Sequence, residues 1–164
     1  MLEHQETLYT IAEIAIALTG FSGIVMVFGK RVDSRPEEER VRLISMLRAS
    51  LVAMFCSFLP LVVEFIITEP DHVWRVSSAI LGTVMSLNVT FFIRSAVFNR
   101  FALSHFQKFT VFGGIAMILA LFSSVIGLIP WTFQIFIIAL IWMLFIASNH
   151  FVLLVVSSTS ADTP

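Results

Sequence analysis

Hydrophobic and polar positions follow one another along this chain in long blocks, not with the short periods of a soluble fold. Five apolar blocks are separated by brief polar stretches, and the last block, residues 131–157, contains no Lys, Arg, Asp or Glu. An α-helix needs about 20 apolar residues to cross the hydrocarbon core of a bilayer. The pattern predicts an all-α integral membrane protein. It would be a single domain over residues 1–164, a bundle of transmembrane helices at 8–28, 41–67, 73–98, 108–127 and 131–157.

Only residues 128–130 separate the last two blocks. Pro130 cannot continue a helix without losing a hydrogen bond and clashing with the preceding turn, and the neighbouring Trp131 suits a membrane interface. Five full spans are therefore expected. A four-span bundle, in which the last pair crosses imperfectly, stays open as the alternative.

Composition agrees with a lipid environment. Hydrophobic residues make up 58% of the chain and charged residues 13%, against about 45–50% and 25% in soluble domains. The lipid bilayer is thus the first expected partner, and the membrane is expected to be a plasma or inner membrane. The basic residues flank the spans and form no separate patch, so nucleic acid is not an expected partner.

The distribution of positive charge predicts the orientation. Five of the ten Lys and Arg residues lie between positions 30 and 42, and Arg94, Arg100 and Lys108 surround the third connection. Cytoplasmic connections carry an excess of Lys and Arg. Connections one and three should therefore face the cytoplasm, which places the N-terminus outside and the C-terminus inside.

The first connection also carries local signals. Ser34 and Glu37 match a capping box with Pro36 in the first turn. A helix from residue 35 to 67 would be about 50 Å long, longer than the roughly 30 Å hydrocarbon core, so its start should project into the cytoplasm. This stub, with the loop at 30–42, is either a solvated helix end or a docking surface for a protein partner.

Ionisable and amide side chains inside the spans are the candidate functional residues, because such groups are costly in lipid. The outer half contains Glu13 and Glu64, and the cytoplasmic half contains Arg48, Arg94, Asn149 and His150. Glu13 has no basic residue in its layer and suits binding of a proton or cation. His150 suits a proton-responsive role. The alternatives are headgroup contact for Glu13 and Glu64, snorkelling for Arg48 and Arg94, and an interfacial hydrogen bond for His150.

A polar stripe follows the third expected helix. At 100° per residue, one arc of roughly 80° contains Ala79, Thr83, Ser86, Thr90 and Arg94. It could line a wet path for an ion, or it could let helices approach closely and hydrogen-bond. The small residues at 113, 116, 120, 123 and 127, and Ala15, Thr19 and Gly23, favour close helix packing. Pro60 leaves the Cys56 carbonyl without its usual donor and could kink the second span.

No catalytic residue, cofactor site or metal site is predicted. The chain contains no Gly-rich phosphate loop after a strand, no Gly-x-Ser-x-Gly elbow, and no metal-ligand cluster. We therefore do not expect an enzyme. The favoured function is conduction or transport of a proton or small ion by a homo-oligomer. The alternative is a non-catalytic membrane scaffold, sensor or assembly subunit whose intramembrane polar residues serve helix packing.

Overall fold

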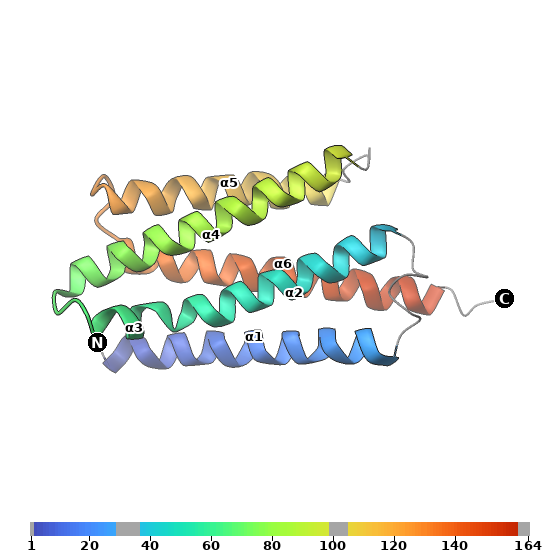
Figure 1. The fold of residues 1–164 in the computed structure, drawn as a ribbon, viewed down its shortest axis with the longest axis horizontal. Coiled ribbons are helices and arrows are strands. Elements are labelled where there is room, and N and C mark those ends of the chain that lie inside the picture. The colour runs from blue at the N-terminus through green and yellow to red at the C-terminus, as the bar shows by residue number, and fades with distance from the viewer. Residues whose placement is uncertain (1, 29–36, 99–104, 161–164) are drawn as a thin grey trace. The chain divides into compact units, whose positions relative to one another are not determined.

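The computed structural model describes residues 2–28, 37–98 and 105–160, which form helices joined by short turns and contain no strand (Figure 1). The helices are α1 (Leu2–Phe28), α2 (Glu37–Ser57), α3 (Leu59–Glu64), α4 (Pro70–Phe98), α5 (His105–Val125) and α6 (Thr132–Ser160). Within these residues, five segments have the length and apolar composition of membrane spans, with α2 and α3 together making the second. The all-α architecture with five apolar helices of span length is therefore confirmed.

Several helices begin before or end after the apolar blocks, although α3 and α5 end two or three residues earlier than expected. α1 begins at Leu2, α2 at Glu37, and α6 continues to Ser160. Hydropathy identifies only the part of a helix that can lie in hydrocarbon, whereas polar residues at its ends continue the same backbone hydrogen bonding in a polar layer. Ser34 of the expected capping box and positions 30–36 of the expected partner loop lie outside the described residues.

The chain divides into two compact units, and the first contains residues 1–57 and 143–164. In this unit α1 and α2 lie side by side (Figure 1). Their buried positions recur every three or four residues and are often small, which lets two helices approach closely. These positions include Leu8, Ala12, Ala15 and Ser22 on α1 and Leu43, Met46, Ala49 and Ala53 on α2. The end of α6 belongs to the same unit, where Phe151 contacts Phe21 with ring centroids 5.7 Å apart.

The second unit contains residues 58–142. Here α4 packs along α5, and α3 packs on α4 (Figure 1). The start of α6 joins this unit through aromatic contacts, because the Trp74 ring lies 4.8 Å from that of Phe133 and 5.9 Å from that of Phe136, between centroids. Both Trp74 and Phe136 are buried.

A tight turn separates α5 from α6. The Leu128 amide donates to the Ser123 carbonyl at 3.0 Å, and the Gly127 amide donates to that of Ser124 at 3.1 Å. This pair of bonds is a Schellman motif, which requires a left-handed residue at its centre. Gly127 supplies it with φ 81°. The chain thus reverses within a few residues, and Trp131 begins the next helix by accepting the Ile135 amide at 3.1 Å.

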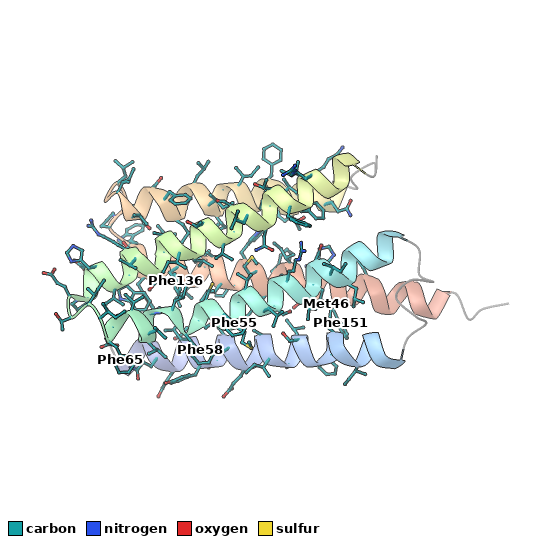
Figure 2. All side chains as sticks on the ribbon, viewed as in Figure 1. Met46, Phe55, Phe58, Phe65, Phe136 and Phe151 are labelled. Carbon is teal, nitrogen blue, oxygen red and sulfur yellow. The ribbon has the colours of Figure 1, made fainter. Side chains whose placement is uncertain are left out.

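The second span, expected as one helix over 41–67, consists of two. α2 ends at Ser57 and α3 begins at Leu59 with Pro60 in its first turn. Proline has no N–H and cannot donate to the carbonyl four residues earlier, so the helical ladder is interrupted at this point. Phe58 nevertheless keeps helical dihedral angles, φ −86° and ψ −11°. Figure 2 shows Phe55, Phe58 and Phe65 along this span.

Candidate functional site

The polar stripe of α4 lies on a largely exposed side of the helix. Thr83, Thr90 and Arg94 are exposed, and Ser86 is half-buried. Three apolar residues, Val76, Ile80 and Leu87, are exposed at intervening helical positions. The exposed face therefore alternates between aliphatic and polar side chains along the length of the span.

The hydroxyls of this stripe donate to their own helix. Thr83 Oγ1 donates to the Ala79 carbonyl at 2.8 Å, and Ser86 Oγ donates to the Gly82 carbonyl at 2.7 Å. Asn88 Nδ2 similarly donates to the Val84 carbonyl at 2.9 Å. Such bonds satisfy the donor without water, while the hydroxyl oxygen can still accept a hydrogen bond or contact a cation.

Glu13 lies on the exposed side of α1. Within the described residues its carboxylate forms no ion pair or hydrogen bond. α1 begins at Leu2, so Glu13 is about 16 Å along the axis from the start of the helix at 1.5 Å per residue. Its neighbourhood includes further exposed small or polar residues, among them Thr10, Ala17 and Gly20.

Glu64 and Arg94 lie at or near the ends of their helices. Glu64 is the half-buried last residue of α3, and Arg94 is exposed, about one turn before α4 ends at Phe98. A long side chain near a helix end can reach a polar layer.

Asn149 and His150 lie near the end of α6 in the first unit. His150 is 4% exposed and continues the buried face formed by Met143 and Ala147. Asn149 is half-buried, and its Nδ2 donates to the Phe145 carbonyl at 3.1 Å. Phe21 meets Phe151 at this level, about 12 Å along α1 from Glu13. The structure therefore does not bring Glu13 and His150 together, although both belong to the first unit.

The candidate residues form two separate sets. The first unit contains Glu13, Asn149 and His150, and the second contains Glu64 and the α4 stripe. Within the described residues, no group of three or more His, Cys, Asp or Glu side chains is placed to hold a metal ion. At the start of α4, His72 Nδ1 lies 2.7 Å from Glu69 Oε2, with both side chains mostly exposed.

Two packing features of the structure were not expected from the sequence. The adjacent Ser77 and Ser78 of α4 are fully buried, and their hydroxyls have no hydrogen-bond partner among the described residues. The three- and four-residue spacing from Trp74 to Leu81 could have placed both serines on the buried face.

The second feature is the packing of Trp142 against α5. Its indole packs directly over Gly113 of α5, with Cε2 3.0 Å from the point that a Cβ at Gly113 would occupy. The Phe109 ring lies 5.7 Å away between centroids. The small-residue pattern of the fourth expected helix pointed to close packing at Gly113, but not to an aromatic partner. Ala116 of the same pattern is exposed.

No protein-family model, curated protein or solved structure matches this chain.

Proposed function

We propose that the chain is a multi-pass membrane protein that assembles as a homo-oligomer and conducts a proton or a small ion. The observation that carries this proposal is the exposure of Thr83, Thr90 and Arg94 along one side of α4. A polar row on the outside of a span is poorly accommodated by hydrocarbon, whereas an aqueous path or a neighbouring polar helix accommodates it. A second copy of the chain would cover the row and confine water along it.

Glu13 is the proposed ion- or proton-binding group. An exposed carboxylate about 16 Å from the start of an apolar helix is costly unless a proton, a cation or a hydrogen-bond donor accompanies it. Within the described residues no basic side chain pairs with it. The proposed orientation is an outer N-terminus and a cytoplasmic C-terminus. A proton or cation would therefore reach Glu13 from the outside.

A second function has its own supporting observation. The hydroxyls of Thr83 and Ser86 and the amide of Asn149 donate to carbonyls of their own helices. Side chains satisfied in this way need no water, and small hydroxyl residues commonly line helix interfaces. The chain would then be a non-conducting scaffold, sensor or assembly subunit, and the exposed side of α4 would be an assembly surface.

Ion flux in proteoliposomes separates the two functions. Wild-type protein should carry protons, Na⁺ or K⁺ under a pH or voltage gradient, and Glu13→Gln and the double variant Thr83→Val/Thr90→Val should lose that flux while remaining folded. Thr19→Val is the control, because Thr19 also donates to its own helix, at the Ala15 carbonyl, and lies on a different side of α1 from Glu13. It should retain flux.

The assembly state of the same samples completes the test. Loss of flux with an unchanged oligomer supports conduction. Absence of flux in well-folded wild type, with dissociation of the oligomer in the Thr83→Val/Thr90→Val variant, would refute conduction and favour the assembly function.

A further inference from the structure

α4 begins and α5 ends at the same end of the second unit (Figure 1). At this end the guanidinium of Arg75, a residue near the start of α4, lies beside Gly127, the left-handed residue of the turn after α5. A Cβ at Gly127 would be 3.7 Å from Nη2 and 3.8 Å from Nη1 of Arg75, which is an ordinary contact distance. Both terminal nitrogens of the cation therefore lie against an exposed turn.

The positive charge of Arg75 is not neutralised by the residues around it. Arg75 is exposed, and its guanidinium forms no ion pair or hydrogen bond with another described residue. Asp71 precedes it by one turn of α4, a spacing that allows an ion pair, yet these two described residues form none. The end of α5 attracts a cation, but a helix C-terminus carries only about half a negative charge. The N–H donors of Arg75 are thus available to an anion.

Large apolar side chains flank this cation. Ile126 and Leu128, on either side of Gly127, are 71% and 73% exposed, and Trp131 is 66% exposed. A soluble anion gains nothing from such side chains, whereas they stabilise the acyl chains of a lipid whose phosphate lies beside them. An unpaired guanidinium next to exposed aliphatic and indole side chains therefore fits an amphiphile with an anionic head.

We propose that Arg75 and the turn at 126–131 form a binding site for the phosphate group of a phospholipid. The guanidinium is a planar fork of N–H donors, and this geometry suits bidentate hydrogen bonding to phosphate oxygens. Ile126, Leu128 and Trp131 contact the adjoining part of the acyl chains. The site rests on the assignment of the chain to a membrane, but it is independent of ion conduction and of the orientation of the chain, since both leaflets contain phospholipid.

Native mass spectrometry of the purified protein in detergent micelles measures the affinity for added ligands, and three probes separate the two parts of the site. Dioleoyl phosphatidylglycerol has both a phosphate and acyl chains, dioleoylglycerol lacks the phosphate, and glycerol 3-phosphate lacks the acyl chains. Phosphatidylglycerol should bind at least about tenfold more tightly than either, because charge-assisted hydrogen bonds and apolar contacts both contribute. Equal affinity for dioleoylglycerol would overturn the role of the phosphate. Equal affinity for glycerol 3-phosphate would identify a site for a soluble anion and overturn the lipid assignment.

Variants of two cations place the phosphate. Arg75→Gln should weaken the binding of phosphatidylglycerol by about tenfold and leave that of dioleoylglycerol unchanged, because only the charge-assisted hydrogen bonds are lost. Lys108→Gln is the matched control, since Lys108 is an exposed cation near the start of α5, at the other end of the same unit. An equal loss in both variants would show a general attraction to acidic lipid and overturn the site.

A second pair of variants tests the apolar part without altering any charge. Leu128→Ala should weaken the binding of phosphatidylglycerol severalfold, because less apolar surface is covered by the acyl chains. Leu119→Ala, at a position 63% exposed within α5, should leave it unchanged. Both leucines are largely exposed, so these variants should remain folded even where Arg75→Gln does not. Unchanged affinity in Leu128→Ala would overturn the proposal.

Discussion

Replacing Gly113 with Ala should destabilise the packing of α5 against the start of α6. The Trp142 indole occupies the space that the new methyl group requires, and three of its ring carbons would crowd or overlap it. The Phe109 ring lies beside the indole, 5.7 Å away between centroids, so a shift of the indole disturbs this contact as well. Either the indole leaves its position or the two helices separate.

The magnitude follows from two opposing effects. Overpacking a fitted site costs about 1–3 kcal/mol, and the severity of this overlap favours the upper end. Ala is a better helix former than Gly by about 1 kcal/mol. The net expectation is a loss of about 2 kcal/mol in the free energy of unfolding.

Matched glycines isolate the steric effect. A Cβ at Gly20 would meet no atom within 4 Å, whereas one at Gly82 would lie 3.3 Å from Cζ of Phe122. Gly20→Ala should therefore leave stability unchanged or raise it by up to about 1 kcal/mol. Gly82→Ala should fall between the two. Unfolding of purified protein by SDS in mixed micelles, followed by circular dichroism, gives the three free energies.

A double variant tests the cause directly. Trp142→Phe removes the indole carbons that Gly113 accommodates, so Gly113→Ala should cost less in that background than in wild type, with a coupling energy of at least about 0.5 kcal/mol. Equal stability of Gly113→Ala and Gly20→Ala, or strict additivity in the double variant, would refute the steric argument.

Substitutions at three further positions test the second unit by the same unfolding assay. Gly127→Ala should cost about 1–2 kcal/mol because Gly127 has φ 81°, and Gly127→Asn should cost less because Asn tolerates the left-handed region; equal costs would contradict this. Trp74→Leu should lower stability by more than about 1 kcal/mol, since two aromatic contacts each contribute about 0.5–1.5 kcal/mol. His72→Ala should change it by less than about 0.5 kcal/mol, because water screens its exposed pair with Glu69, and a larger loss would reveal an unrecognised role.

The number and character of the long helices could be predicted from the sequence because a span needs an uninterrupted apolar run. The turn between α5 and α6 was also predictable, because Pro130 cannot continue a helix. The form of the second span was predictable only in part. Pro60 indicated a kink, whereas the division of this span into α2 and α3 at Phe58 depends on local backbone geometry that a hydropathy pattern does not specify.

Which side of each helix is covered could not be predicted. In a soluble helix, polar residues mark the solvent face, but in a membrane span every face is apolar and the exposed face contacts lipid. The stripe containing Thr83 and Thr90 was therefore recognisable as a stripe, while its exposure was not. The opposite case is His150, whose burial on α6 follows from aliphatic neighbours one and two turns away and not from its own chemistry.

The three tryptophans differ enough in their surroundings to act as built-in depth reporters. Trp74 is 8% exposed, Trp131 is 66% exposed, and Trp142 is half-buried beside Gly113. Trp131 and Trp142 lie 11 residues apart, or about 16 Å along the helix. Lipids brominated at successive acyl carbons would therefore quench these two indoles at different depths. In variants that keep a single tryptophan, native fluorescence would thus measure how deeply each indole lies in a bilayer without any attached label.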